Sequence, residues 1–429
     1  MNPRSTISRR QFLGTAATAA AGLAAPQIVP NTVFGKPGQP APSDRITLGH
    51  IGVGGMGGGH LGGLVGNSRV KSIAVCDVYE ERRLAAKKRV DDAYKTQDCT
   101  AYNDFRDLLD RKDIDAVVIA TPDHWHALTA IHACKAGKDI YCEKPLSLTI
   151  EEGRAMVNAV RRYGRVFQTG SQQRSEWNFR FACELARSGK IGKVHTIRTG
   201  FGASPSMGWE PEESPPAGLD WNLWLGPAPY ENYSKNRCFY QFRWIFDYSG
   251  GQMTDWGAHH NDIAQWGNGS ELSGPVEIDG KGDFPKDGLW NTATWIHVAY
   301  KYASGVTLIC GEGHGCKFEG PDGWIHVDRG FLQAHPKELL DLNDKLGPDD
   351  VHLYRSPGHH QNWLDCIATR EKPICDIEIG HRSVSVCHLG NISMRLGRPI
   401  RWNPEKEQIV GDDDANRYLS KPMRAPWHL

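Results

Sequence analysis

A glycine-rich loop directly after an apolar segment most constrains how this 429-residue chain can fold. The segment Arg45 to Ile51 alternates into an apolar strand, and a helix-length segment from Met56 to Val65 follows the loop. In such a strand, turn and helix unit, the first glycine permits the tight turn, and the second lets the backbone approach a pyrophosphate. The third glycine brings the helix close to the strand, and the helix N-terminus faces the phosphates. We therefore expect a dinucleotide to bind at Gly52, Gly54, Gly55, Met56 and Gly57.

A second predicted strand, Val70 to Cys76, ends in Asp77, 20 residues after Gly57. An acid at this place can bind a ribose 2′-hydroxyl and would repel a 2′-phosphate, which favours NAD over NADP. Arg82 and Arg83 weaken this preference. Asp77 could instead cap the helix that begins next to it.

Strand and helix patterns alternate regularly up to Gly170. The expected strands after the second one are 115–121, 139–142 and 165–169, and the expected helices are 124–136 and 149–163. This alternation predicts an α/β fold, a doubly wound parallel Rossmann sheet that binds ligands beyond the carboxyl ends of its strands. We assign residues 45–170 to this NAD-binding domain.

The pattern changes after Ser171, where longer segments alternate polar and apolar residues. The expected strands are 194–202, 292–302 and 306–311, and the expected helices are 253–266, 360–369 and 381–396. This alternation is typical of an antiparallel sheet covered on one face. Residues 171–429 are therefore predicted to form an α+β domain. Most of the five aromatic residues Trp221, Trp224, Tyr230, Tyr240 and Trp244 are expected to pack in a core or an oligomer interface, although stacking on a sugar is the alternative.

Charge and composition exclude several classes of partner. Lys+Arg and Asp+Glu both number 50, and no basic stripe indicates nucleic acid. No window of 18 apolar residues predicts a membrane span, so small molecules are the expected partners. The eleven cysteines are scattered without a Cys-x-x-Cys pair, which predicts buried free thiols. The histidine spacing matches no zinc motif, so we expect no metal.

The first 44 residues have a different character. Ser8-Arg9-Arg10-Gln11-Phe12-Leu13 precedes an alanine-rich run to Ala25, which resembles a twin-arginine export signal. A Pro/Gly-rich linker, 26–42, follows it. We expect the twin-arginine machinery to export the folded protein with its nucleotide to the periplasm or beyond. The alternative is a disordered basic leader on a cytoplasmic protein.

Oxidation of an alcohol requires a positioned base and a group that stabilises developing charge. Asp255 and His259 are four residues apart on an expected helix, so they should share one face with Asp262. A carboxylate one turn from an imidazole can orient it. We expect His259 to be the base and Asp255 to orient it or to bind substrate, the alternative being a surface ion pair.

Thr121 and Pro122 form an expected turn at a strand end, where the nicotinamide side of a dinucleotide would lie. His126, in the following helix, could border the ribose or the ring. His360, at the start of a later helix, could reach the substrate.

Four motifs occur in order along the chain. They are the glycine loop with Asp77, Ala120-Thr121-Pro122 followed by His126, Glu143-Lys144-Pro145, and Asp255-x-x-x-His259. In these motifs the chain resembles the glucose-fructose oxidoreductase and inositol dehydrogenase (Gfo/Idh/MocA) family over nearly everything after residue 44, especially its exported bacterial members. The resemblance implies a Rossmann domain and a large open-faced sheet through which relatives oligomerise, hence a homodimer or homotetramer.

The resemblance also implies roles for single residues. Lys144 would be the cation that hydrogen-bonds the reacting oxygen, placed near the nicotinamide by Pro145, a proline that is often cis in relatives. Glu143 would hold the lysine beside the cofactor. Gln172 and Arg174, after the last Rossmann strand, would contact cofactor or substrate.

Three functions follow from these residues. The first is an NAD-dependent oxidoreductase that acts on a secondary hydroxyl of a sugar, polyol or glycoside, with Lys144 and His259 handling the proton. The second uses the same site and tightly held NAD to cleave a glycoside by transient oxidation, elimination and re-reduction, without net redox change. The third is a non-catalytic sugar-binding protein on a retained dehydrogenase scaffold.

Overall fold

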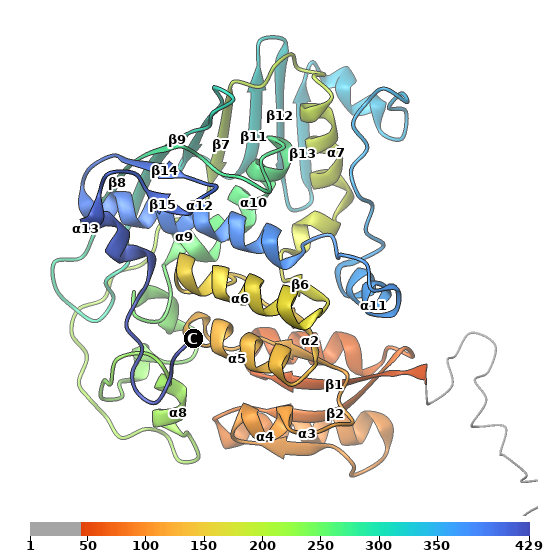
Figure 1. Ribbon diagram of the computed structural model, residues 1–429, viewed down its shortest axis with the longest axis vertical. Helices are drawn as coiled ribbons and strands as arrows, with labels where there is room; N and C mark the ends of the chain where they lie inside the picture. Colours follow the sequence, from red (N-terminus) through yellow and green to blue (C-terminus); the bar gives the residue numbers. More distant parts are fainter. Residues whose placement is uncertain (1–43) are drawn as a thin grey trace, which may run out of the picture. The chain divides into compact units, whose positions relative to one another are not determined.

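The first sheet of the protein has six parallel strands in the order β3-β2-β1-β4-β5-β6 (Figure 1). The computed structural model describes residues 44–429, so the expected export signal and the whole linker lie outside the described residues. The strands are β1 (Ile46–Ile51), β2 (Val70–Cys76), β3 (Thr100–Tyr102), β4 (Ala116–Ile119), β5 (Asp139–Cys142) and β6 (Phe167–Thr169). The predicted doubly wound parallel sheet is confirmed.

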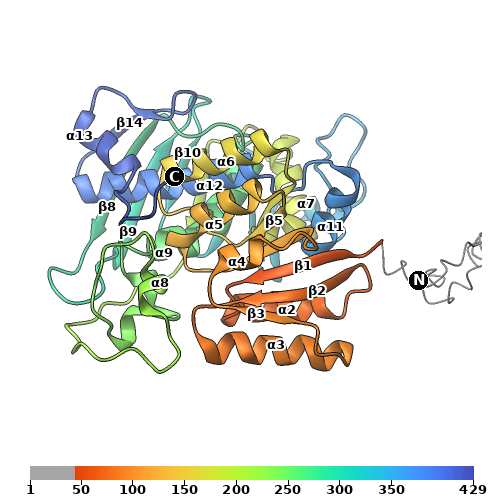
Figure 2. The same cartoon turned by 60° about the horizontal axis from the view of Figure 1, so that its bottom comes forward.

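Helices cover both faces of this sheet. They include α2 (Gly55–Val65), α3 (Glu80–Tyr94), α4 (Phe105–Leu109), α5 (Asp123–Lys135) and α6 (Ile150–Tyr163). Figure 2 shows α3 on one side of β1, β2 and β3, with α5 on the other side. Because both faces are covered, β4 and β5 are buried along their whole length.

The second sheet has nine strands in the order β13-β12-β11-β7-β10-β9-β8-β14-β15. The strands are β7 (Thr196–Gly200), β8 (Glu277–Asp283), β9 (Trp295–Lys301), β10 (Thr307–Cys310), β11 (Gly315–Gly320), β12 (Gly323–Asp328), β13 (Phe331–His335), β14 (Ile400–Asn403) and β15 (Gln408–Ile409). All neighbouring strands are antiparallel except β7 and β10. The predicted, mainly antiparallel second sheet is therefore confirmed.

Three helices pack on one face of the second sheet (Figure 1). They are α7 (Trp177–Arg187), α10 (Gly257–Gly267) and α12 (Ile377–Leu396). Residues of β9 alternate between buried and accessible positions, as expected for a strand with one covered face. Helix α12 also contacts α6 of the first domain.

The helices of the second half differ from their expected bounds. The expected helix 253–266 is interrupted at Trp256, which separates α9 (Gln252–Asp255) from α10. Helix α12 begins at Ile377, four residues before the expected start, because the Asp376 carboxylate caps it by accepting the Glu378 N–H at 3.2 Å.

Helix α11 (His359–Thr369) packs on the first sheet, although in the chain it comes after β13, a strand of the second sheet. Trp363 is buried against Leu48 and Tyr141 in one hydrophobic cluster. Arg69 also forms an ion pair of 2.6 Å with Asp365. This return of the chain brings α11 close to the carboxyl ends of β5 and β6.

Residues 219–249, here called the covering segment, include α8 (Trp221–Leu225) and lie against the first domain. Asp220 Oδ2 accepts a hydrogen bond from Asn103 Nδ2 at 2.9 Å, and Ser249 Oγ donates to Asp123 Oδ2 at 2.5 Å. The segment has its own aromatic core of Trp221, Trp224, Trp244 and Tyr248. The expectation of core packing is thus confirmed for Trp221, Trp224 and Trp244, whereas Tyr230 and Tyr240 are exposed.

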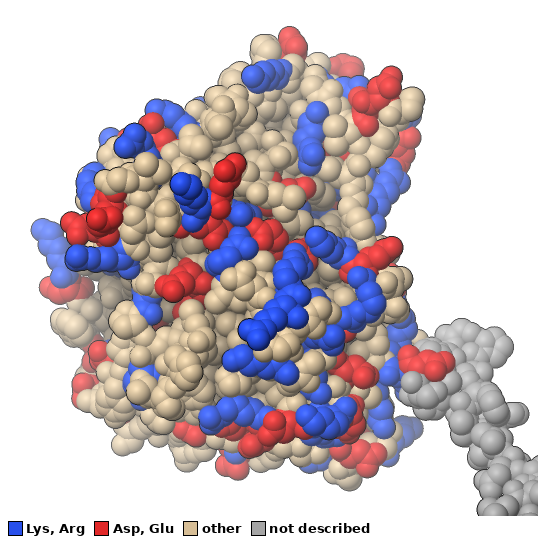
Figure 3. Space-filling model, in the orientation of Figure 1, with Lys and Arg blue, Asp and Glu red and all other residues tan. Residues whose placement is uncertain are grey.

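No helix among residues 44–429 is long and apolar enough to cross a membrane. All eleven cysteines are buried and free, as predicted. Lys and Arg side chains lie among Asp and Glu side chains over the face shown in Figure 3.

Candidate functional site

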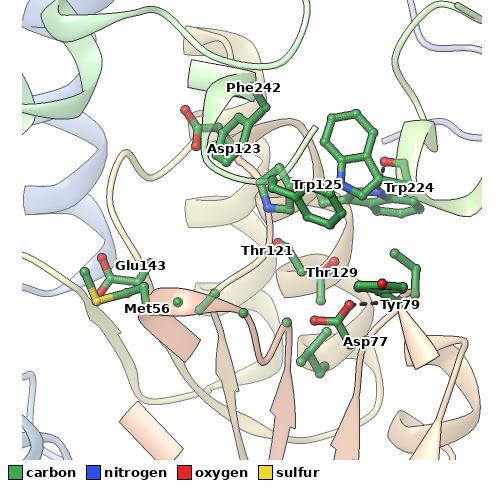
Figure 4. Close-up of a pocket in the computed structure, with 18 of the residues that line it drawn as sticks. Met56, Asp77, Tyr79, Thr121, Asp123, Trp125, Thr129, Glu143, Trp224 and Phe242 are labelled. Atoms are coloured by element: carbon green, nitrogen blue, oxygen red, sulfur yellow. Dashed lines mark hydrogen bonds between the residues drawn. The ribbon is translucent and has the colours of Figure 1, made fainter. Parts of the chain in front are cut away.

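A cavity of about 520 Å³ lies at the carboxyl ends of the central strands of the first sheet. Ile51, Cys76 and Glu143, at or directly after the ends of β1, β2 and β5, line it. Figure 4 shows Asp77 and Tyr79 at one end, Glu143 and Met56 at the other, and Thr121 between them. This placement agrees with the ligand-binding edge of a doubly wound sheet.

The glycine loop forms the floor between the two ends. Gly52 has φ +79°, a conformation that side chains disfavour, and a Cβ at Gly57 would lie 1.9 Å from the Gly52 carbonyl oxygen. Helix α2 therefore begins in direct contact with β1, and its first turn carries no acidic side chain. The positive end of the helix is suited to a pyrophosphate. Gly52, Gly54, Gly55 and Met56 line the cavity, whereas Gly57 is the buried spacer between helix and strand.

Asp77 lines one end of the cavity and also holds the loop. Its Oδ2 accepts the Val53 N–H at 3.0 Å, and its Oδ1 accepts the Tyr79 N–H at 2.9 Å. Burial raises the pKa of Asp77. Arg82 lines the same end with its guanidinium 4.5 Å from the Phe239 ring centre, whereas Arg83 donates to Asn103 Oδ1 at 3.3 Å. The expected ribose end thus presents one acid and one arginine.

Replacing Asp77 with alanine should lower NAD affinity by at least about tenfold, because a hydrogen bond to a charged group contributes about 1.5–3 kcal/mol. NADP affinity should fall less or rise, since the repelling carboxylate is gone. Calorimetric titration of both nucleotides checks the ratio of their Kd values, and the exposed Asp92→Ala variant is the control. An unchanged ratio would contradict the assignment of Asp77 to the ribose.

Lys144 and Asp255 meet at the other end of the cavity. The Lys144 Nζ lies 2.5 Å from Asp255 Oδ1, and Arg243 Nε lies 3.5 Å from Asp255 Oδ2. Burial alone would raise the pKa of Asp255, but the Lys144 and Arg243 charges outweigh it and hold the pKa below its ordinary value. The Lys144–Pro145 peptide bond is cis. The sequence motifs containing Lys144 and Asp255 are thus brought together.

The expected contact between Asp255 and His259 is absent among the described residues. The interruption at Trp256 separates their helices, and Asp255 turns to Lys144 and Arg243 instead. His259 Nδ1 is buried with no hydrogen-bond partner in the described part of the chain. Burial, and then the Lys144 and Arg329 charges, hold the pKa of His259 well below its ordinary value. His259 is therefore a neutral imidazole with a free nitrogen, a state that can accept a proton, but it is not among the residues that line the cavity.

Four of the expected cofactor residues form the cavity wall or support it from behind. Thr121 and Pro122 line the cavity directly. The His126 ring nitrogens lie 2.8 Å and 2.9 Å from the carbonyl oxygens of Pro145 and Thr121, so His126 joins the two wall loops from behind. Gln172 Nε2 donates to Glu143 Oε1 at 2.8 Å, which places Gln172 behind Glu143.

Arg174 and Asp262 do not line this cavity, contrary to the expectation that Arg174 contacts substrate. The Arg174 guanidinium is buried, and it pairs with Asp262 at 2.7 Å and with Glu271 at 3.0 Å. Asp262 also accepts the Ser383 hydroxyl at 2.5 Å, so it is turned away from Asp255. Through Asp262, helix α10 is thus joined to Arg174, which follows β6, and to Ser383 of α12. His360 likewise lies outside the cavity lining and hydrogen-bonds His60.

The covering segment supplies wall residues that the sequence did not single out. They share an aromatic or apolar character, except for one arginine, and face the glycine loop from the second half of the chain. They are Leu219, Leu223, Phe239, Phe242 and Arg243. Trp224 and Tyr240, which the sequence did single out as aromatic, also line the cavity. The aromatic content of the segment was the only sequence feature that could have indicated these wall residues. The local sequence did not indicate which rings face the cavity.

Two family models cover most of the chain. Residues 46–171 match the model described as an oxidoreductase family with an NAD-binding Rossmann fold. Residues 201–429 match the C-terminal alpha/beta domain model of the same oxidoreductase family. The cavity geometry fits this cofactor, since a glycine loop lies between Asp77 and Lys144.

Curated relatives match over part of the chain. Inositol 2-dehydrogenase from Salmonella typhimurium is 33% identical over 150 residues, 34% of this chain and 43% of the relative. A glycosyl hydrolase family 109 protein from Shewanella pealeana is 35% identical over 173 residues, 36% of this chain and 37% of the relative. The matches thus span less than half the length of these relatives.

Solved structures match over most of the chain. The aldose-aldose oxidoreductase from Caulobacter crescentus has a TM-score of 0.61 at 20% identity, covering 83% of this chain and 99% of that one. The WlbA dehydrogenase from Bordetella pertussis, solved with NADH and UDP-GlcNAcA, has a TM-score of 0.62 at 16% identity, covering 84% and 99%. At these identities the likeness shows the fold. Together with the two family models, these findings show that the chain belongs to the Gfo/Idh/MocA oxidoreductase family.

Proposed function

We propose that the protein is an NAD-dependent oxidoreductase that oxidises or reduces a secondary hydroxyl of a sugar, polyol or glycoside. The observation that carries this proposal is the meeting of Lys144, Asp255 and Arg243 at the cavity end opposite Asp77. Sugar- and polyol-related names among the relatives, such as inositol 2-dehydrogenase, support the substrate class.

NAD, when bound, accepts or donates a hydride at the nicotinamide. The protein must then hold the reacting hydroxyl and manage its proton. Lys144 is the donor suited to the reacting oxygen, because its side chain is only 10% exposed and Asp255 holds its ammonium at 2.5 Å. His259 is suited to take up the proton, because its imidazole is neutral and its Nδ1 is free in the described structure. Asp255 positions Lys144 in this proposal.

A second candidate function is cleavage of a glycoside through transient oxidation, elimination and re-reduction. The covering segment favours it, since Asp220 and Ser249 bond it to the first domain and its aromatic residues form one wall of the cavity. A cofactor enclosed in this way would be retained between turnovers. The glycosyl hydrolase family 109 relatives lend further support.

The two functions predict different products. With excess NAD and a panel of polyols and free sugars, the oxidoreductase should accumulate NADH in step with oxidised product. With a panel of nitrophenyl glycosides and no added NAD, the second function should release nitrophenol without NADH. Mass spectrometry of nucleotide extracted from the purified protein shows whether NAD is retained. Absence of both products across the panels, with NAD bound, would favour a sugar-binding protein.

Export and assembly are further parts of the proposal. The Arg9-Arg10 sequence supports export through the twin-arginine route, and an exported enzyme gains from a retained cofactor because free NAD is scarce outside the cytoplasm. Assembly into a homodimer or homotetramer is supported by the one-sided covering of the second sheet.

A further inference from the structure

A chain of hydrogen-bonded side chains leads away from the cavity wall beside Lys144. Glu143 Oε1 lies 2.8 Å from His60 Nε2, and His60 Nδ1 lies 2.8 Å from His360 Nε2. Glu143 lines the cavity and His60 is buried, whereas His360 is only half-buried. Each ring thus uses one nitrogen toward the cavity, and His360 Nδ1 has no partner among the described residues. The three side chains connect the cavity to solvent.

The surroundings keep this path in place. The rings of His60 and His360 both pack on Tyr141, at centroid distances of 5.0 Å and 5.1 Å. Gln172 Nε2 donates to Glu143 Oε1 at 2.8 Å, and the Lys144 backbone N–H donates to Glu143 Oε2 at 3.2 Å. Glu143 is therefore held from both sides, with its carboxylate at the cavity and against His60.

The protonation states also suit a path. Burial alone would raise the pKa of Glu143, but the His60 hydrogen bond and the Lys144 charge outweigh it and keep the carboxyl ionised. Burial, and to a smaller extent the His60 charge, lower the pKa of His360 to about 4, so the ring is neutral near pH 7. A neutral imidazole can accept a proton on one nitrogen while it gives one from the other.

We propose that Glu143, His60 and His360 form a proton relay between the reaction cavity and solvent. This inference rests on the proposed function, because a hydroxyl that loses hydride also leaves one proton in the cavity. With the carboxylate ionised, His60 donates its Nε2 proton to Glu143, and His360 donates its Nε2 proton to His60 Nδ1. For reduction, His360 Nδ1 takes up a proton from water, the His360 Nε2 proton moves to His60 Nδ1, and the His60 Nε2 proton moves to Glu143, which returns it to the cavity. Oxidation uses the reverse order: Glu143 receives the proton that the hydroxyl has lost, and His360 Nδ1 releases one to water.

Passage in one direction changes the tautomer of both imidazoles, and passage in the opposite direction restores it. The relay therefore serves oxidation and reduction equally, including a cycle in which both occur. Glu143 is the member that faces the cavity, while His60 and His360 act through it.

The test compares His360→Gln with the neighbouring His359→Gln. Glutamine at 360 can hydrogen-bond His60 but cannot relay a proton, so kcat should fall on the order of 10²-fold, the lower end of what proton transfer contributes. KM, NAD affinity and melting temperature should stay unchanged. His359 bonds Ser175 Oγ and the Thr169 carbonyl, outside the relay, so its variant should keep the kcat of the wild type. In His360→Ala, added imidazole should restore much of the lost rate.

Wild-type kcat in His360→Gln would overturn the relay. A loss of kcat in His360→Ala that imidazole and other small buffers do not restore would also overturn it. A second measurement does not depend on turnover. In ¹⁵N-histidine NMR spectra, Glu143→Gln should shift the ring resonances of both His60 and His360, whereas unchanged His360 resonances would show that the chain is not coupled. Failure of the proposed function would instead appear as an inactive wild type with intact coupling.

Discussion

Replacing Lys144 with methionine is expected to reduce turnover by about 10³-fold while NAD affinity changes by no more than a few fold. The physical reason is that a preorganised charge aimed at the reacting oxygen contributes about 10²–10³-fold, and loss of proton handling adds to it. Methionine keeps most of the side-chain volume, so the cavity wall beside Pro145 should remain packed. Steady-state kinetics and calorimetric NAD titration measure the two effects separately.

Two comparisons make this expectation specific. Lys88→Met removes an exposed lysine that pairs only with Asp92, and it should leave kcat unchanged. Asp255→Asn removes the acid that holds Lys144 but keeps the ammonium, so kcat should fall less than in Lys144→Met. Full turnover in Lys144→Met would contradict the assignment of the lysine to the reacting oxygen.

The first sheet was predictable because its signals are local. Each strand is a short apolar run followed by a turn and a helix pattern, and β2 and β5 have the bounds that the sequence indicated. The glycine loop and Asp77 lie at adjacent strand ends, so topology alone brings them together. Lys144 lies near them for the same reason, since it follows β5.

The second half was harder to predict, because its strands pair with partners far along the chain. Strand β8 pairs with β14, more than 100 residues later, and its glycines weaken the strand pattern. The sequence did not predict the interruption at Trp256, because the helix pattern continues through that position. As a result of the interruption, Asp255 contacts Lys144 instead of His259. The contact between His60 and His360 spans 300 positions and has no sequence signal at all.

The second large expected effect is on NAD affinity and comes from a substitution in the glycine loop. Comparing two glycines of helix α2 separates the effect of a backbone contact from the effect of helix propensity. Replacing Gly57 with alanine should lower NAD affinity by at least about 10²-fold. The new Cβ would lie 1.9 Å from the Gly52 carbonyl oxygen, and this neighbour is backbone that cannot rotate away. Helix α2 must then move off β1, at an overpacking cost of about 1–3 kcal/mol. Its N-terminus would no longer face the pyrophosphate.

Gly59→Ala is the matched control in the same helix. A Cβ at Gly59 meets nothing within 4 Å, so alanine should raise the free energy of unfolding by about 0.5–1 kcal/mol through helix propensity alone. Thermal unfolding with and without NAD, together with the Kd for NAD, distinguishes the two variants. If Gly57→Ala binds NAD like Gly59→Ala, the close contact between helix and strand does not position the cofactor. If only Gly57→Ala loses both stability and NAD binding, the position of α2 against β1 is what orients its N-terminus toward the phosphates.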